Sequence, residues 1–234
     1  MDALSEPVLI LGIGNLLWAD EGFGVRAVEE LNRRYDFPGH VRLLDGGTQG
    51  IYLVQHIRET RILVVFDAVD YGLPPGTLKL VEGDDVPRFL GSRKVSLHQT
   101  GFQEVLAMAE MMGDKPAHML LIGVQPAELE DFGGSLTDSV KSCIEPALEA
   151  ALAYLARFGV IPSRRAALRD VSQTLASVEM APDAYEGGRP SQEAAPRNGD
   201  VRIVASPHWR GPDDYEGEIE RLLDVPPQSP AGAS

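Results

Sequence analysis

The sequence predicts a three-layer α/β protein: a mostly parallel, twisted sheet of five strands with helices on both faces, followed by a poorly ordered C-terminal extension. Up to about residue 160, apolar runs alternate with segments of helical period, and this alternation favours a parallel sheet between two helical layers. Residues 61–66 are almost wholly apolar and rich in β-branched side chains, as a central strand requires. Beyond residue 160, proline and glycine clusters interrupt the chain.

Each element up to residue 160 is expected from its periodicity. In chain order the expected strands are residues 8–11, 41–44, 61–66, 77–81 and 119–124, and the expected helices are residues 24–35, 51–57, 99–112 and 136–158. Residues 77–81 alternate in polarity as a half-exposed edge strand does. Pro146 interrupts the last helix, so we expect a kink there, or a restart with the proline in the first turn.

The C-terminal extension, residues 161–234, is predicted to be largely disordered and separate from an α/β peptidase domain at residues 1–160. Clusters such as Gly187-Gly188-Arg189-Pro190 prevent a continuous fold. Three short segments could form a helix, a strand and a further helix, without an evident core to pack on: residues 166–178, 201–205 and 216–223. The alternative is an arm whose short apolar pieces become ordered when it docks on a partner.

Composition excludes several classes of protein. The 21 Lys and Arg against 35 Asp and Glu give a net charge of −14, which disfavours nucleic acid and anionic membrane surfaces as partners. The single cysteine, Cys143, excludes an internal disulfide framework, and its apolar helical neighbours predict a packed thiol. Residues 1–6 lack the basic region of a signal peptide, and no apolar run approaches a membrane span. We expect a soluble, cytoplasmic monomer.

The loop after the first strand resembles part of a dinucleotide-binding fingerprint. Gly12-Ile13-Gly14 follows a buried strand, and Asp45 ends the next one. The position of the third glycine is taken by Leu17, however, and Asp20 and Glu21 would repel a pyrophosphate. Dinucleotide binding is therefore disfavoured. Taken alone, Asp20 is expected to cap the helix that follows it, and Glu21 to be an ordinary acid at a helix start.

Two carboxylates and one imidazole are expected at the same rim of the sheet. Glu21 follows the first strand, Asp67 follows residues 61–66, and His98 precedes the helix at 99–112. Each has an ordinary alternative: a helix-start acid, a turn-forming aspartate and an exposed loop histidine. Together they form a ligand set suited to Ni, Zn, Mn or Fe, with open coordination positions. Their spacing does not establish the site, and the topology only permits it. Asp70 is expected to be a solvated loop acid.

Short motifs in a fixed order strengthen this interpretation. They are Gly12-Ile13-Gly14-Asn15, Asp20-Glu21, Gly24-Val25, Asp45-Gly46-Gly47-Thr48, Asp67-Ala68, Pro75-Gly76-Thr77, Ser96-x-His98-Gln99, Gly123-Val124-x-Pro126 and Ile144-Glu145-Pro146-Ala147-Leu148. The ordered series resembles the hydrogenase maturation protease family over about residues 7–160. It is most similar to the branch that processes membrane-bound uptake hydrogenases.

The resemblance implies an endopeptidase that removes a C-terminal peptide from the large-subunit precursor of nickel–iron hydrogenase after nickel insertion. Glu21, Asp67 and His98 fall on the family's metal-contacting positions, and we expect them to be the catalytic and nickel-binding residues. The nickel would come with the substrate, so a purified sample is expected to contain none. Asp45, Gly46 and Gly47 match a family loop near the cleft and are expected to position the substrate.

Two further points stay open at the level of sequence. Either the bound metal activates the attacking water, or a carboxylate does. A non-catalytic nickel metallochaperone, using the same three ligands to hold and release the metal, is the alternative function.

Overall fold

The structure is a computed structural model that describes residues 6–90 and 97–191, and the side chains of all of these except 88–90, 97–100 and 171. The chain divides into two units, Met1–Pro190 and Ser191–Ser234. Apart from Ser191, the second unit lies outside the described residues, as do the segments 201–205 and 216–223 for which a strand and a helix are expected. No helix of the described part is long and apolar enough to cross a membrane.

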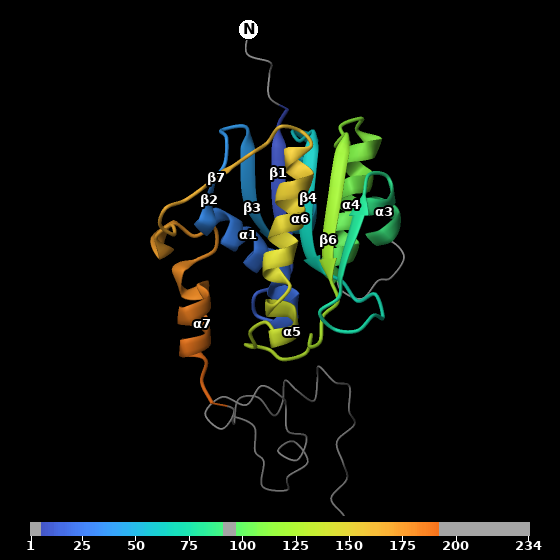
Figure 1. Ribbon diagram of the computed structural model, residues 1–234. Helices are drawn as coiled ribbons and strands as arrows, with labels where there is room; N and C mark the ends of the chain where they lie inside the picture. Colours follow the sequence, from blue (N-terminus) through green and yellow to red (C-terminus); the bar gives the residue numbers. More distant parts are fainter. Residues whose placement is uncertain (1–5, 91–96, 192–234) are drawn as a thin grey trace, which may run out of the picture. The chain divides into compact units, whose positions relative to one another are not determined.

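A five-stranded sheet lies at the centre of the first unit, in the order β3-β1-β4-β6-β5 (Figure 1). Four strands are parallel: β1 (Val8–Ile13), β3 (Val41–Gly47), β4 (Ile62–Ala68) and β6 (His118–Val124). The edge strand β5 (Leu78–Glu82) runs antiparallel to β6. The predicted three-layer α/β fold with a mostly parallel sheet is confirmed.

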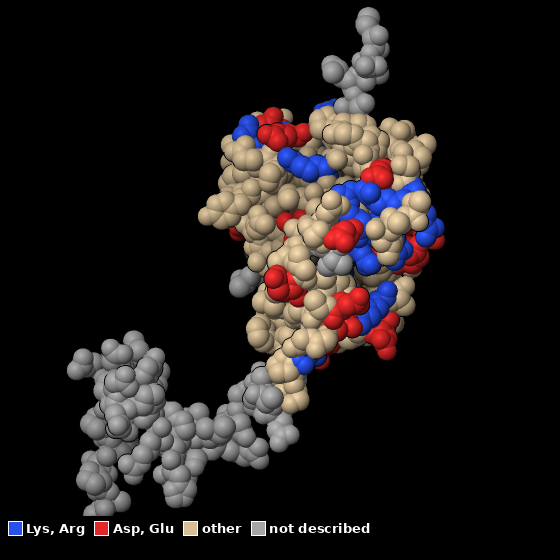
Figure 2. All heavy atoms as spheres, turned by 90° about the vertical axis from the view of Figure 1, so that its left-hand side faces the viewer, with Lys and Arg blue, Asp and Glu red and all other residues tan. Residues whose placement is uncertain are grey.

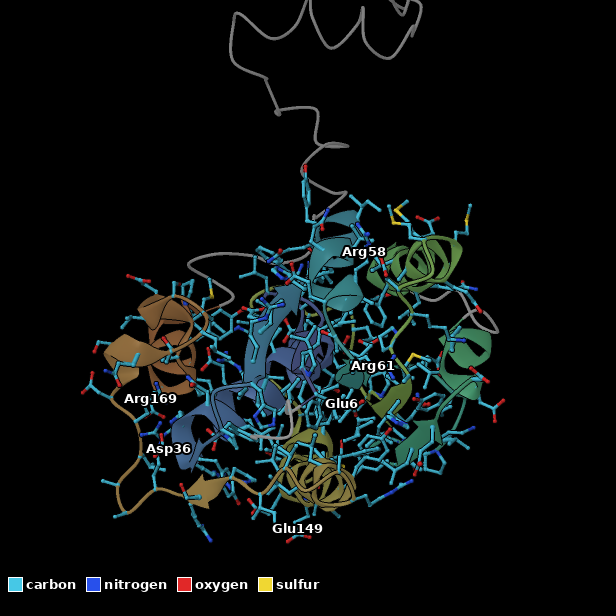
Figure 3. The ribbon with its side chains drawn as sticks, turned by 90° about the horizontal axis from the view of Figure 1, so that it is seen from above. Glu6, Asp36, Arg58, Arg61, Glu149 and Arg169 are labelled. Atoms are coloured by element: carbon cyan, nitrogen blue, oxygen red, sulfur yellow. The ribbon has the colours of Figure 1, made fainter. Side chains whose placement is uncertain are left out.

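Helices cover both faces of the sheet. One face carries α1 (Phe23–Arg34), α5 (Asp138–Lys141) and α6 (Ile144–Ala156). The other carries η2 (Gly50–Leu53), α2 (Val54–Arg58), α3 (Asp85–Leu90) and α4 (Leu97–Met111). Seen from above, Glu149 of α6 and Arg58 of α2 lie on opposite sides of the sheet (Figure 3).

Two hydrophobic cores result, because successive side chains of a strand point to opposite faces. Val8 and Ile10 of β1 pack with Phe23 and Leu148 in the core under α1 and α6. Leu9, Leu11 and Ile13 of β1 belong to the other core, which includes Leu53, Ile57, Phe102 and Val105. Since β1 and β4 are buried on both faces, β1 and residues 62–66 of β4 are continuously apolar instead of alternating.

The last helical segment restarts as expected. Helix α5 ends at Lys141, and α6 begins at Ile144, so that Pro146 is its third residue and its missing N–H costs no helical hydrogen bond. Cys143 at the junction is buried, and its thiol donates to the Gly76 carbonyl at 3.0 Å. Cys143 is thus a packed thiol, as predicted.

The extension differs from the prediction as far as the structure describes it, because the compact unit ends at Pro190 and not near residue 160. We call residues 163–190 the arm. It contains β7 (Ser163–Arg164), which pairs antiparallel with β2 (Tyr35–Asp36), and then η3 (Val171–Gln173), η4 (Val178–Met180) and α7 (Pro182–Gly188). The helix expected at residues 166–178 is not formed; only η3 and the first residue of η4 are helical there.

Polar contacts hold the arm in place. The N–H groups of Arg165 and Arg169 donate to the carbonyls of Arg34 and Arg33, at 2.8 and 2.9 Å. Ion pairs join Lys141 to Glu186, Arg189 to Asp131 and Arg165 to Asp36. On this face of the molecule, acidic and basic side chains lie interleaved (Figure 2). A sequence of low hydropathy can therefore be ordered without a core of its own.

Candidate active site

The carboxyl ends of the parallel strands bring the expected site residues to one edge of the sheet. Asp45 in β3 lies opposite Gly12 in β1, which in turn lies opposite Phe66 in β4, the residue before Asp67. With neighbouring strands about 4.8 Å apart, Asp45 and Phe66 are separated by roughly 10 Å. Glu21 lies in η1 (Ala19–Gly22), the turn that connects β1 to α1. Ligand sites in open α/β sheets form at this edge.

Glycines let the start of α1 lie directly on the strand ends. A Cβ added at Gly24 would lie 2.2 Å from the carbonyl oxygens of both Ile13 and Phe66. At Gly14, where φ is +129°, an added Cβ would lie 1.8 Å from the Glu21 carbonyl oxygen. These close approaches place Glu21 beside the ends of β1 and β4, and so on the same rim as Asp67.

Asp67 is only 1 % exposed and pairs with Gly123 of β6. The Tyr71 ring covers that partner, because a Cβ added at Gly123 would lie 1.6 Å from the phenolic oxygen. Burial, and then the negative charge of Asp67, raise the pKa of the Tyr71 phenol above its ordinary value. Tyr71 therefore stays protonated at neutral pH, as a neutral group beside the carboxylate.

His98 is the second residue of α4, at the helix start, and its side chain lies outside the described part of the structure. Among the described side chains, no group of three or more His, Cys, Asp or Glu could hold a metal ion. The set Glu21, Asp67 and His98 includes His98, whose side chain lies outside the described part of the structure. It stays a prediction, with Glu21 and Asp67 placed on the same rim.

The Asp45-Gly46-Gly47 turn ends β3 at the same edge. The Asp45 carboxylate accepts the Gly47 N–H at 2.9 Å, and Gly47 has a φ of +45°, which favours glycine. Burial raises the pKa of the Asp45 carboxyl, against the lowering effects of that N–H and of the Arg26 guanidinium. An open cavity of ≈ 260 Å³ lies beside the turn; its lining includes Gly14, Leu16, Leu17 and Thr48.

Asp20 is not the helix cap that the sequence suggested, since neither η1 nor α1 has a side-chain cap. It is fully buried, and its carboxylate accepts the N–H groups of Ala127, Glu128 and Thr137 at 2.8, 3.0 and 2.7 Å. The Thr137 hydroxyl donates to it as well, at 3.0 Å. Asp20 thus ties the Glu21 turn to the loop after β6. Its main partners are backbone amides, so no residue pattern could have revealed them.

Gln125 is a second residue of the site that the sequence pattern does not reveal. Its side-chain carbonyl accepts the N–H groups of Tyr71 and Leu73 at 2.7 and 3.1 Å, and its amide donates to the Asp70 carboxylate at 3.0 Å. Asp70, expected to be a solvated acid, is therefore part of a hydrogen-bonded loop. This network fixes the loop that carries Tyr71 next to Asp67.

The fold and the site define the class: an α/β protein whose acidic residues gather at the carboxyl edge of parallel strands. A family model described as hydrogenase maturation protease matches residues 25–154. The hydrogenase expression/formation protein HupD of Thiocapsa roseopersicina is 63% identical over 203 residues, 86% of this chain and 92% of that protein. The hydrogenase 2 maturation protease of Escherichia coli is 42% identical, over 70% of this chain and 99% of that protein.

The solved structures agree with this. The hydrogenase maturating endopeptidase HybD from E. coli superposes with a TM-score of 0.65 and 39% identity, covering 68% of this chain and 98% of that one. The chain belongs to the hydrogenase maturation protease family, in its uptake-hydrogenase branch, and is an endopeptidase.

The two kinds of relative differ in how much of this chain they match. A match of 68% that includes β1 cannot also contain the whole arm. A continuous stretch that spans 86% of this chain contains residues 163–190 wherever it begins. The arm is therefore shared with the uptake-branch relative and lies beyond the compact E. coli structure.

Proposed function

We propose that the protein removes a C-terminal segment from the large-subunit precursor of a nickel–iron hydrogenase after nickel has been inserted. Membership of the maturation protease family supports this proposal. So does the name of the E. coli relative, a hydrogenase 2 maturation protease. The single observation that carries the site assignment is the placement of Glu21 and Asp67 on one rim, by the contact of Gly24 with Ile13 and Phe66.

In this proposal the nickel is part of the substrate. Glu21, Asp67 and His98 contact it, and their contact fixes the scissile peptide at the carboxyl edge of the sheet. The substrate's nickel polarises the carbonyl or acidifies a water molecule, and one of the two carboxylates takes the proton. Recognition of a metal by the protease checks that maturation has reached the right stage. The protein acts in the cytoplasm as a monomer.

The test uses the precursor prepared with and without nickel. The wild type should release a short C-terminal peptide from the nickel-loaded precursor only. Glu21→Gln, Asp67→Asn and His98→Ala should each slow this cleavage on the order of 100-fold or more, because each removes a group that contacts the reacting centre. Mass spectrometry measures the product, and circular dichroism checks the fold.

Glu149→Gln, on the exposed surface of α6, is the matched control and should cleave at the wild-type rate. Wild-type cleavage by any of the three site variants would remove that residue from the site. Equal cleavage of the two precursors would contradict nickel recognition. Nickel transfer without cleavage would favour the metallochaperone.

A further inference from the structure

Three polar residues of α1 are buried beneath the arm. Arg26, Glu29 and Asn32 are 7 %, 6 % and 8 % exposed, at a spacing of three that places them along one side of the helix. Buried charged and amide side chains need hydrogen-bond partners. Here the arm supplies them.

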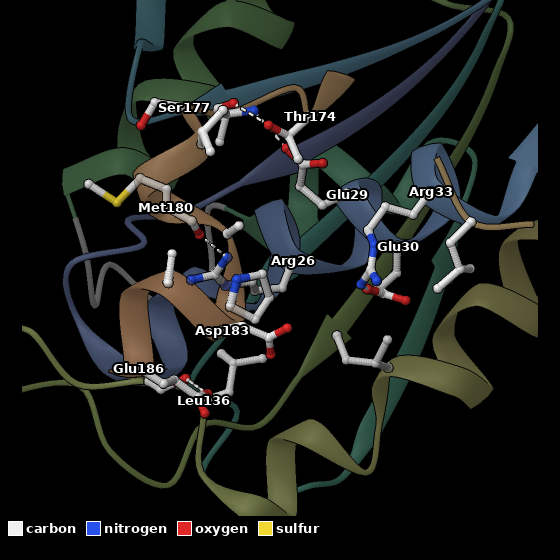
Figure 4. Close-up of a pocket in the computed structure, with 18 of the residues that line it drawn as sticks. Arg26, Glu29, Glu30, Arg33, Leu136, Thr174, Ser177, Met180, Asp183 and Glu186 are labelled. Carbon is white, nitrogen blue, oxygen red and sulfur yellow. Dashed lines mark hydrogen bonds and ion pairs between the residues drawn. The ribbon is translucent and has the colours of Figure 1, made fainter. Parts of the chain in front are cut away.

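The partners are backbone groups of the arm. The Arg26 guanidinium is directed at the Met180 carbonyl and donates to it (Figure 4). The Glu29 carboxylate accepts the Ala176 N–H at 2.6 Å, and the Asn32 amide donates to the Gln173 carbonyl at 3.1 Å. Residues 173–180 are thus fixed at three points along α1.

One apolar contact accompanies these polar ones, because the half-buried Leu175 of the arm packs on the core under α1 and α6. A cavity of ≈ 610 Å³ lies between the arm and the helices; Arg26, Glu29, Leu136 and Ile144 are among the residues that line it (Figure 4). Beside this cavity, the three polar contacts to α1 and the packing of Leu175 together set the position of residues 173–180.

The fixed segment also borders the predicted substrate-positioning turn. Ala176, Ser177 and Met180 line the ≈ 260 Å³ cavity whose other residues include Asp45, Gly47, Leu16 and Leu17. One wall of that cavity is therefore the arm, and another is the edge of the sheet. Leu16, Leu17 and Met180 suit an apolar side chain, while the Asp45 carboxylate offers an acceptor to an N–H group.

We propose that Ala176, Ser177 and Met180 contact the precursor and determine which precursor is accepted, with Arg26 and Glu29 as positioning residues that hold them. The ligand is an extended peptide segment of the precursor, with an apolar side chain in the cavity and an N–H donor directed at Asp45. This inference rests on the proposed function, because the precursor is its ligand. The match of the arm to the uptake-branch relative supports a role in choosing among precursors.

The experiment measures both binding and cleavage of the protein's own nickel-loaded precursor. Met180→Ala removes part of the cavity wall, and Ser177→Trp, at an exposed position, fills the cavity. Both should raise Kd and KM on the order of 10-fold and leave kcat within about twofold. Val178→Ala is the matched control, because Val178 lies in the same turn of the arm but does not line this cavity.

The positioning role of Glu29 is tested by separate variants. Glu29→Ala removes the acceptor of the Ala176 N–H and should raise KM as Met180→Ala does. Glu29→Gln keeps an acceptor, so its KM should be close to that of the wild type. Selectivity for the protein's own precursor over that of E. coli hydrogenase 2 should fall in Met180→Ala.

The outcomes separate the two proposals. Wild-type Kd and KM in both Met180→Ala and Ser177→Trp would overturn the arm's role and leave the proposed function intact. Binding without cleavage by the wild type would refute the proposed function, while the effect of Ser177→Trp on Kd would still decide the arm's role. Absence of binding by the wild type would overturn both.

Discussion

Glycine positions at the start of α1 determine where the acidic residues of the site lie. An added Cβ at Gly14 or Gly24 would come within 1.8 to 2.2 Å of a backbone oxygen, a distance that no side-chain movement relieves. These glycines are therefore required by backbone contacts and not by a phosphate, which the negative charges of Asp20 and Glu21 would repel. A glycine pattern alone does not identify its ligand.

Gly14→Ala tests this residue-scale argument. The substitution strains a φ of +129° and forces Cβ against the Glu21 carbonyl, so we expect the free energy of unfolding to fall by about 2 kcal/mol or more. Urea unfolding measures it. Gly39→Ala, where an added Cβ meets no atom within 4 Å, should change it by less than about 1 kcal/mol. Equal effects of the two variants would refute the steric explanation.

Single residues of the site were only partly predictable from sequence. Asp67 follows a continuous apolar run. Such a run predicts a strand that is buried on both faces, as β4 is, and so predicts that Asp67 lies at the end of that strand. Asp20 and Gln125 could not be predicted, because they bind mostly backbone groups from distant parts of the chain. Spacing in sequence carries no trace of such contacts.

At the scale of elements, Asp20 connects η1 with the loop that follows β6. Asp20→Ala removes the acceptor of three backbone N–H groups, so the free energy of unfolding should fall by about 2–4 kcal/mol. Chemical denaturation measures it. Glu149→Ala, exposed within α6, should stay within about 0.5 kcal/mol of the wild type. A change of that small size in Asp20→Ala would mean that the loop is held by other contacts.

The strands and the helices were largely predictable, since each has an apolar period that matches its packing. The arm was not. Its residues 173–180 bind α1 through the Met180 and Gln173 carbonyls and the Ala176 N–H, backbone groups that any residue would supply. Its partners Arg26, Glu29 and Asn32 look, in sequence, like the solvated side of an amphipathic helix.

At the scale of the whole molecule, docking of the arm has an electrostatic cost that depends on pH. Burial, and secondarily the negative charge of Asp45, raise the pKa of Glu29, while the Ala176 N–H and Arg26 lower it; the net direction is upward. The folded state therefore binds this proton more tightly than the unfolded state, and Glu29 lowers stability as pH rises from its unfolded pKa through its folded pKa.

Glu29→Gln removes this dependence while keeping the acceptor. The free energy of unfolding of the variant should increase relative to that of the wild type as the pH rises from about 4 to about 7. Urea unfolding at a series of pH values measures it, with Glu149→Gln as control for the exchange of carboxylate for amide. A difference that is constant with pH, or that falls, would contradict the raised pKa of Glu29.

The polar side of α1 also matters for the order in which the chain is made. Synthesis begins at the N terminus, so the strands and α1 emerge from the ribosome before residues 173–180 exist. Until then, water can hydrate Arg26, Glu29 and Asn32. Leucines at these positions would instead form an exposed hydrophobic patch to which other nascent chains could bind. A junction of this kind lets a segment that is made late bind to a fold that has already formed.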